Sequence, residues 1–253
     1  MIEVENLVKR FGGRVTLKGI SFTVHDGEIY GLLGPNGSGK STTMRILAGI
    51  IPPSDGKIVV NGIDVAERPM DVKRITGYIP ETPLLYESLT PMEFFSLVGS
   101  IRKIPKGELE ERVERLVSAF GIEEYVGELI GTLSFGTRQK VSIIAGLLHD
   151  PEVLILDEAI NGLDPKSARI MKELLNGFKE EGKSIVFSTH VLAIAEAVCD
   201  RIGIIYNGEL IAEGTPEELK SFAHEENLED VFLKLTQSQE EVSSLVRALK
   251  EAF

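Results

Sequence analysis

The chain has 253 residues, of which 43% are hydrophobic and 26% are charged, a composition that excludes an intrinsically disordered protein. The formal net charge of −12 argues against a broad basic surface, so we expect no nucleic-acid partner. A single cysteine excludes an internal disulfide, and no uncharged apolar run approaches the roughly 18 residues that a membrane span needs. We therefore expect a cytoplasmic location.

The N-terminal part of the chain predicts sheet before helix. Apolar segments bounded by turn residues indicate strands over residues 2–8, 20–24 and 28–33. A short helix is expected over residues 40–47, after a glycine-rich loop. Residues 57–60, followed by the turn pair Asn61 and Gly62, predict a hairpin that returns to the early sheet.

Residues of about 82–150 predict an inserted helical subdomain. Thr90, Pro91 and Glu93 have the pattern of a capping box with proline at the first helical position, so a helix is expected to begin there. Between residues 106 and 120 the apolar positions recur at helical spacing.

Strands and helices alternate in the next part of the chain. The pattern predicts strands over 153–156 and 184–188 and helices over 165–179 and 190–199. Asp164 stands where the first of these helices needs an N-cap, and Asn207-Gly208 predicts a hairpin after it. This alternation indicates an α/β fold with a mainly parallel sheet and flanking helices, to which the early strands add an N-terminal antiparallel β subdomain.

The C-terminal part of the chain is acidic and helical in pattern. From Glu213 onward there are ten acidic and four basic residues, which is half of the total charge excess. Two apolar groups at helical spacing, first Val231, Phe232 and Leu235 and then Val242, Leu245 and Leu249, predict amphipathic helices that pack on the body or on a partner.

Residues 34–41, Gly-Pro-Asn-Gly-Ser-Gly-Lys-Ser, match the phosphate-loop pattern G-x-x-x-x-G-K-[ST] between a predicted strand and a predicted helix. Glycines allow backbone N–H groups to surround a phosphate, and the helix N-terminus adds its positive end. The lysine is expected to reach the β- and γ-phosphates, and the serine to bind Mg²⁺. The sequence thus predicts a nucleoside triphosphate and Mg²⁺ as ligands and a P-loop NTPase core. The candidate binding residues are Gly34, Asn36, Gly37, Ser38, Gly39, Lys40, Ser41 and Thr42.

A second half of such a site follows 117 residues later, where the apolar strand 153–156 ends in Asp157 and Glu158. A carboxylate at this edge of the sheet is suited to hold the metal, so Asp157 is the candidate ligand with Ser41. Glu158 is then the candidate general base for a water molecule in line with the γ-phosphate. The alternative for Glu158 is an acid exposed on the surface.

Taken together with these motifs, further segments make residues 1–220 resemble the ATP-binding subunits of ABC transporters. Leu133-Ser134-Phe135-Gly136-Thr137 resembles the LSGGQ signature, and Gly162-Leu163-Asp164-Pro165 resembles the D-loop. Phe11 stands where that family stacks an aromatic ring on adenine, His190 where it has its switch histidine, and Glu81 where its Q-loop has glutamine. We expect residues 221–253 to form a C-terminal acidic helical extension beyond the resemblance.

The resemblance implies a homodimer, or a pair with another ATPase subunit, in which each ATP lies between one phosphate loop and the partner's signature. Ser134 and Gly136 are then phosphate contacts, although Ser134 also suits a plain N-cap. Asp164 joins the nucleotide site, and His190 bonds the γ-phosphate unless it is an ordinary histidine. Without the resemblance, Phe11 reads as a core residue.

Three positions depart from the family pattern. Glu81 replaces the glutamine of the Q-loop, and an ionised carboxylate there accepts hydrogen bonds or binds the metal but cannot donate. Phe135 and Thr137 replace the first glycine and the glutamine of the signature. We include Glu81 among the catalytic residues with Lys40, Glu158 and His190, and among the metal ligands with Ser41 and Asp157.

The resemblance predicts an ATPase that drives transport. Export is favoured by Glu81, by the run Asn161-Gly162-Leu163-Asp164-Pro165 and by the tail segment 228–235. A separate transmembrane permease is expected to hold the chain on the inner face of the membrane, with the apolar segment 82–97 as the groove for a permease helix or as core of the helical subdomain. Two alternatives stay open: a weakly hydrolytic half of a heterodimer, and a soluble ABC ATPase that acts on ribosomes or DNA.

Overall fold

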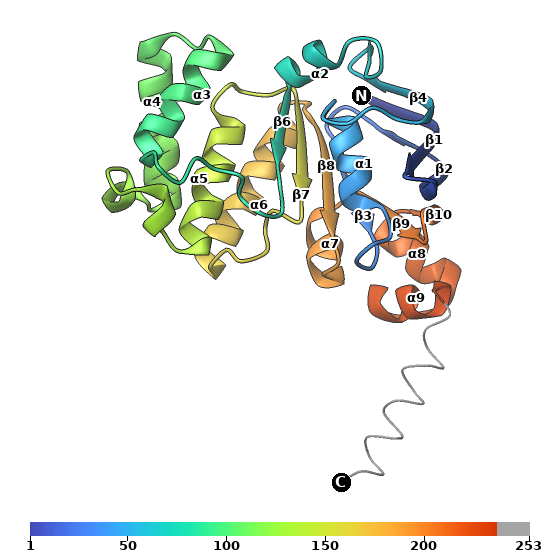
Figure 1. Ribbon diagram of the computed structural model, residues 1–253. Coiled ribbons are helices and arrows are strands. Elements are labelled where there is room, and N and C mark those ends of the chain that lie inside the picture. Colours follow the sequence, from blue (N-terminus) through green and yellow to red (C-terminus); the bar gives the residue numbers. More distant parts are fainter. Residues whose placement is uncertain (237–253) are drawn as a thin grey trace.

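The computed structural model describes residues 1–236, which form two sheets and nine α-helices (Figure 1). The antiparallel sheet has the order β2-β1-β4-β5, and the larger sheet has the order β10-β9-β3-β8-β7-β6. In the larger sheet only β10 runs antiparallel to its neighbour. The predicted combination of a mainly parallel core and an N-terminal antiparallel subdomain is confirmed.

The antiparallel sheet is built from the first two long strands and a hairpin. Its members are β1 (Ile2–Phe11), β2 (Arg14–Val24), β4 (Asp55–Val60) and β5 (Ile63–Asp64). At the tip of the hairpin Asn61 has φ 45° and Gly62 has φ 75°, as the predicted turn pair requires. The hairpin pairs with β1 through β4, so it returns to the early sheet as expected.

The larger sheet is the framework of the site. Its strands are β3 (Ile29–Leu33), β6 (Thr76–Ile79), β7 (Val153–Asp157), β8 (Ser184–Thr189), β9 (Arg201–Tyr206) and β10 (Glu209–Gly214). Every residue of β3, β7 and β8 is buried, which is the pattern of a parallel sheet covered on both faces. Along β7 the apolar side chains alternate between two hydrophobic clusters, with Leu154 and Leu156 in one and Val153 and Ile155 in the other.

Helices cover the larger sheet. The antiparallel sheet and α1 (Lys40–Leu47) belong to one face, with α2 (Pro69–Ile75) near the start of β6 (Figure 1). The other face carries the helical subdomain, α3 (Pro91–Arg102), α4 (Lys106–Phe120) and α5 (Phe135–Leu147), together with α6 (Pro165–Glu180) and α7 (Leu192–Val198). Thr90 and Glu93 form the predicted capping box of α3.

The C-terminal helices α8 (Pro216–Ala223) and α9 (Leu228–Leu235) pack on the body. Leu219, Leu228 and Val231 are at most 3% exposed and belong to the same cluster as the helical face of the sheet. The predicted amphipathic group at Val231 is therefore a packing face. The second predicted group, Val242, Leu245 and Leu249, lies outside the described residues, and the division at residue 220 stays a prediction.

The elements α2, β6 and α7 differ from the sequence-based expectation. Neither α2 nor β6 was expected, because this stretch is short and its turn residues are sparse; β6 is the edge strand that leads to Glu81. The helix expected from residue 190 begins at Leu192, because β8 extends to Thr189. In the described residues no helix is both long and apolar enough to span a membrane.

Candidate active site

The phosphate loop connects the buried end of β3 to the first turn of α1. A Cβ atom on Gly34 would lie 2.3 Å from the carbonyl oxygen of Ile205, so only glycine fits beside β9. Gly39 caps α1 with φ 115° and provides no side-chain hydrogen bond to the helix. The first N–H groups of α1 are therefore left for another acceptor, which is the property that makes helix N-termini bind anions.

Ser38 adds a second sign of a missing partner within this loop. Its side chain is 3% exposed, and its hydroxyl has no hydrogen-bond partner among the described residues. Buried hydroxyls are rarely left unpaired in folded proteins. A phosphate oxygen held by the loop would satisfy it.

Lys40 lies at the centre of the site, and its side chain is 4% exposed. Its ammonium donates to the carbonyl oxygens of Gly34 at 2.7 Å and Pro35 at 3.2 Å. It also forms an ion pair with Glu158, with Nζ 3.1 Å from Oε1. The structure thus brings the phosphate-loop lysine directly against the candidate base.

Asp157 lies at the carboxyl end of β7 and collects three hydroxyl donors. Ser41 Oγ is 3.0 Å and Ser188 Oγ is 2.8 Å from Oδ1, and Tyr78 OH is 3.3 Å from Oδ2. Burial and the charge of Asp157 raise the pKa of Tyr78 to about 12, which keeps this phenol a donor. Ser41 and Asp157 present hard oxygen atoms side by side at the phosphate loop, a donor pair that fits Mg²⁺ completed by water and phosphate oxygens.

Glu158 is a buried acid, 4% exposed, so the alternative of a surface acid is wrong. Its backbone has φ 51°, in the left-handed region that is unusual for a non-glycine residue, and its N–H donates to Ser188 Oγ at 3.1 Å. Oε2 accepts a hydrogen bond from Asn161 Nδ2 at 3.0 Å and contacts His190 Nδ1. Three neighbours therefore fix the position of this carboxylate: Lys40, Asn161 and His190.

Phe11 lies at the end of β1 on the rim of a cavity of about 610 Å³ that also contacts Gly37 and Thr42 of the phosphate loop. The ring is 48% exposed, so it is not a core residue. The ammonium of Lys9 lies 4.8 Å from the ring centroid on one side. Phe11 and the phosphate loop thus share one hollow, as stacking on a bound base would require. Arg14 lines the same hollow.

The signature segment lies on the helical subdomain. Ser134 is the N-cap of α5, with its Oγ accepting from the N–H of Thr137 at 3.2 Å. No hydrogen bond or ion pair joins Ser134 or Gly136 to residues 34–42 within the described chain. The structure of one chain thus does not bring the signature to its own phosphate loop.

Helix α5 is fastened to the loop that follows Glu158. The ring of Phe135 packs against Gly162, where an added Cβ would lie 2.7 Å from it. Gln139 is fully buried, and its amide donates to the carbonyl oxygens of Ala159 at 2.8 Å and of Pro80 at 3.5 Å. One side chain therefore links α5 both to the loop of Glu158 and to the end of the segment that carries Glu81.

Asp164 caps α6 and is also held by α5. Its Oδ1 accepts from the N–H of Ser167 at 2.9 Å, and Lys140 Nζ lies 2.8 Å from Oδ2. The hydrogen bond from Lys140 and those from Ser167 hold the pKa of Asp164 well below its usual range. The predicted N-cap is confirmed, and within the described chain this carboxylate is committed to structural partners.

Glu81 follows β6 and stands at the same carboxyl edge of the sheet as Asp157. Its side chain is exposed, and no hydrogen bond or ion pair joins it to another described residue. The structure therefore places Glu81 near the site without assembling it into the cluster around Asp157. Its metal and catalytic roles stay predictions.

Four residues at this site were not found from the sequence: Arg14, Tyr78, Gln139 and Asn161. The signals for Asn161 and Gln139 were present, since Asn161 lies three residues after Glu158 and Gln139 one turn into α5. Neither was predicted as a site residue, because a motif does not specify the side-chain and backbone atoms that become their partners. Tyr78 required knowledge of β6, which was missed.

Comparison with known proteins agrees with this geometry. The sequence model described as "ABC transporter" matches residues 17–161. Linearmycin resistance ATP-binding protein LnrL of Bacillus subtilis is 37% identical over 87% of the chain and 71% of its own length.

Two solved structures are similar to the fold as a whole. One, described as the ATP binding subunit of an ABC transporter, has a TM-score of 0.88 and 35% identity, and covers 93% of this chain and 99% of its own. The other is the dimeric structure of MJ0796, a bacterial ABC transporter cassette. It has a TM-score of 0.78 and 25% identity, and covers 85% of this chain and 98% of its own.

Proposed function

The chain belongs to the ABC transporter family of ATP-binding proteins, and from this premise we propose that it hydrolyses ATP to drive a separate membrane subunit. The observation that carries the proposal is the buried cluster of Lys40, Asp157 and Glu158 at the phosphate loop. Phosphoryl transfer to water needs a lysine that binds phosphate, a carboxylate that binds the metal and a second carboxylate that accepts a proton from water.

The proposed reaction begins when the phosphates of ATP bind in the loop and replace Glu158 as the ion-pair partner of Lys40. The N–H groups at the start of α1 and the hydroxyl of Ser38 bind phosphate oxygens, and Phe11 stacks on the base. Ser41 and Asp157 would hold Mg²⁺, which supplies positive charge next to the β- and γ-phosphates.

Glu158 is then free to act as the base. Its carboxylate accepts a proton from the water that attacks the γ-phosphorus, the bond to the β,γ-bridging oxygen breaks, and ADP and phosphate are formed. His190, half-exposed and already in contact with Glu158, is placed to donate a hydrogen bond to the γ-phosphate. Asn161 keeps the carboxylate oriented while Lys40 changes partner.

We propose that two copies, or this chain and a related ATPase subunit, close head to tail on ATP. Two facts support this: the signature does not meet the phosphate loop within one chain, and a similar cassette is known as a dimer. Ser134 and Gly136 would then complete the site of the partner subunit, at the N-terminus of α5. Glu81 would contact the metal-bound water or the metal from its place beside β7.

The proposed membrane partner docks at the groove between α3 and the end of β6. Leu84, Leu85 and Phe94 line this groove, and Leu84 is 80% exposed. Phe95 of the expected apolar set is instead fully buried core of the subdomain. Export is favoured by the relative LnrL, whose name records resistance, together with Glu81 and the acidic C-terminal helices. The chain would then lie on the inner face of the membrane through its permease.

ATP turnover by the purified chain tests the ATPase proposal, with Lys40→Ala as the variant and Lys57→Ala, an exposed lysine on β4, as the matched control. We expect Lys40→Ala to abolish turnover and the control to retain it; unchanged turnover in both would contradict the phosphate-loop assignment.

Affinity purification from membranes distinguishes the transport proposal from its alternatives. A polytopic partner supports transport, ribosomes or DNA would support the soluble class, and a second ATPase subunit would support the heterodimer.

A further inference from the structure

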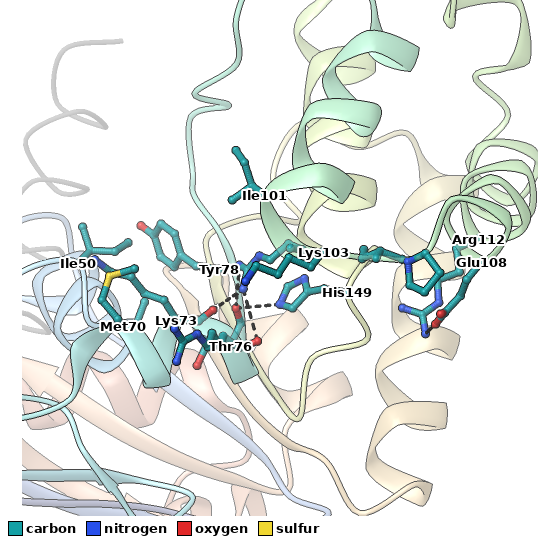
Figure 2. Close-up of a pocket in the computed structure, with 15 residues that line it drawn as sticks. Ile50, Met70, Lys73, Thr76, Tyr78, Ile101, Lys103, Glu108, Arg112 and His149 are labelled. Carbon is teal, nitrogen blue, oxygen red and sulfur yellow. Dashed lines mark hydrogen bonds and ion pairs between the residues drawn. The ribbon is translucent and has the colours of Figure 1, made fainter.

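A cavity of about 810 Å³ lies outside the active site, at the start of β6 (Figure 2). Its walls come from the C-terminal ends of α2 and α3, from the connection between α3 and α4, and from His149 before β7. Asp157 and the phosphate loop lie at the opposite, carboxyl edge of the sheet. The volume is within the range of small-molecule sites, roughly 300 to 1,000 Å³.

The cavity is basic in a protein that is strongly acidic. Five lysine or arginine side chains and one acidic side chain line it, whereas the whole chain has a net charge of −12. The basic residues are Lys73, Arg74, Arg102, Lys103 and Arg112, and the acidic one is Glu108. Glu108 is paired with Arg112, and Arg74 with Asp71. Lys73 and Lys103 have ammonium groups with no partner among the described residues.

Arg102 adds a partly buried positive charge to the cavity, and no carboxylate among the described residues pairs with it. Its guanidinium donates to the carbonyl oxygen of Lys73 and reaches those of Arg74 and Thr76 at 3.4 Å (Figure 2). Burial lowers the pKa of Arg102, in keeping with a guanidinium that has lost water and has no carboxylate partner in the described structure. A desolvated cation of this kind is stabilised by an anion.

Two buried polar atoms on the same wall are also unpaired. Thr76 is 3% exposed and its hydroxyl has no hydrogen-bond partner in the described structure. His149 contacts the carbonyl oxygen of Thr76 through Nε2 at 3.1 Å, but its Nδ1 is buried and unpaired. Outside the phosphate loop only two other side-chain atoms in the described chain share this condition. Two of the five unpaired buried atoms in the described chain therefore belong to residues that line this cavity, and a ligand there could pair with them.

The rim of the cavity is apolar. Ile50, Met70 and Ile101, the three large exposed apolar side chains of the lining that we call its rim, are 45%, 62% and 70% exposed, and Tyr78 also lines the cavity. A ligand that suits both parts has an anionic group for the lysines and an apolar or planar part for the rim. Tyr78 also donates to Asp157, so the cavity is one side chain away from the active site.

We propose that this cavity binds a phosphoryl group, with Lys73, Lys103 and Arg102 as its ligands. Phosphate suits the set because a desolvated guanidinium and two flexible ammonium groups offer donors to several oxygens at once. The phosphoryl group comes from a free phosphorylated small molecule or from a phospholipid headgroup, and the apolar rim accepts the remainder of either.

Inorganic pyrophosphate is the probe for the free source. It is titrated calorimetrically into the full chain saturated with ADP, so that the phosphate loop is filled. The test variant is Lys73→Gln/Lys103→Gln. The control is Lys57→Gln/Lys166→Gln, which removes the same charge at exposed lysines away from the cavity. Because one charge-assisted hydrogen bond contributes about a factor of ten, we expect the test variant to bind at least about tenfold more weakly and the control within about twofold.

Vesicles are the probe for the lipid source. Co-sedimentation with phosphatidylglycerol vesicles is compared with phosphatidylcholine vesicles, using the same two variants. Pyrophosphate binding that is lost in the test variant alone supports a free ligand, and selective vesicle binding lost in that variant alone supports a headgroup. Equal behaviour of the test and control variants with both probes overturns the proposal. Neither probe depends on ATP hydrolysis, so a failed ATPase assay leaves this test intact.

A signal from a residue of the cavity distinguishes binding there from non-specific attraction between the anion and the protein. The ring resonances of His149 are followed by NMR while pyrophosphate is added to the natural chain and to the control variant. We expect a saturable shift with the midpoint of the calorimetric titration. Binding that leaves the His149 signals unmoved would place the anion elsewhere and overturn the assignment.

Discussion

Lys40 Nζ and Glu158 Oε1 lie 3.1 Å apart, and both side chains are 4% exposed. The two groups on which hydrolysis depends therefore neutralise each other inside the protein. In the proposed mechanism a nucleotide phosphate replaces the carboxylate at Lys40 before Glu158 serves as a base. ATP binding and release of Glu158 would then be one exchange of ion-pair partners at Lys40.

Replacing the base tests this exchange and the dimer together. In Glu158→Gln the carboxylate is removed while the shape is retained, so we expect turnover to fall by about 10²- to 10⁴-fold while ATP still binds. Light scattering with Mg-ATP should then show a mass near twice 27.7 kDa, because a closed pair is trapped. The same variant carrying Lys40→Ala should stay monomeric. A chain that binds ATP and remains monomeric would require a different ATPase subunit or the membrane partner for closure.

The buried ion pair also makes a prediction about stability. Lys40→Met leaves Glu158 buried with less compensation, and loss of one partner of such a pair costs up to about 3 to 5 kcal/mol. Adding Glu158→Gln removes the unpaired charge, so the double variant should recover much of the loss. Urea unfolding of the four proteins gives the coupling free energy. Additive losses would mean that His190 and Asn161 alone suffice to hold Glu158.

Asn161 is a positioning residue, because its amide holds Oε2 of Glu158 at 3.0 Å. We expect Asn161→Ala to lower kcat by about tenfold, since a misplaced catalytic group loses rate steeply, and to leave the KM for ATP nearly unchanged. Asn176→Ala on α6 is the matched control. An Asn161→Ala protein whose KM rises while kcat is retained would show a role in nucleotide binding instead.

Phe11 offers one free face, with Lys9 against the other. Loss of stacking costs about 1 to 3 kcal/mol per base, so Phe11→Ala should weaken ATP binding about tenfold or more without loss of fold. Phe11→Tyr keeps the ring and should bind normally. Fluorescent-nucleotide titration with a circular dichroism check distinguishes the two variants, and equal affinities would remove Phe11 from the site.

His149 predicts an acid-sensitive step in stability. Burial, as the largest cause, and the charges of Arg102 and Arg112 together lower the pKa of His149 from 6.5 to about 4. The hydrogen bond to Thr76 and the charge of Asp150 act in the opposite direction. The unfolded chain therefore binds a proton between about pH 6.5 and 4 that the folded chain excludes, so His149 makes stability fall as the pH falls through this window. His149→Gln keeps a donor for Thr76 but does not titrate. The variant should lose less stability than the natural chain between about pH 7 and 4.5 in urea unfolding, and equal losses would mean that His149 protonates freely in the folded state.

The sequence determined most of the phosphate-binding half of the site, for a physical reason. Gly34, Lys40 and Asp157 act through backbone geometry and strand ends, which are local and leave a fixed spacing in the sequence. Strands β3, β7 and β8 were predicted for the same reason, as short apolar runs that end at polar residues. The capping box at Thr90 equally depends on contacts within one turn.

What the sequence did not predict depends on contacts between distant segments. The pairing of Lys40 with Glu158 spans 118 positions, and the bond from Tyr78 to Asp157 needs an edge strand with weak patterning. Glu81 shows the opposite limit: its position in the motif was clear, but its side chain forms no hydrogen bond or ion pair with a described residue. Motifs thus located the functional groups, and only the fold revealed which of them touch.

Gln139 has a mechanical consequence. Its buried amide joins α5 to Ala159 after the base and to Pro80 before Glu81, and Phe135 presses on Gly162 from the same helix. If the helical subdomain rotated without the loop that follows Glu158, these hydrogen bonds would break and leave the buried amide of Gln139 unpaired. We therefore expect the subdomain and that loop to move together.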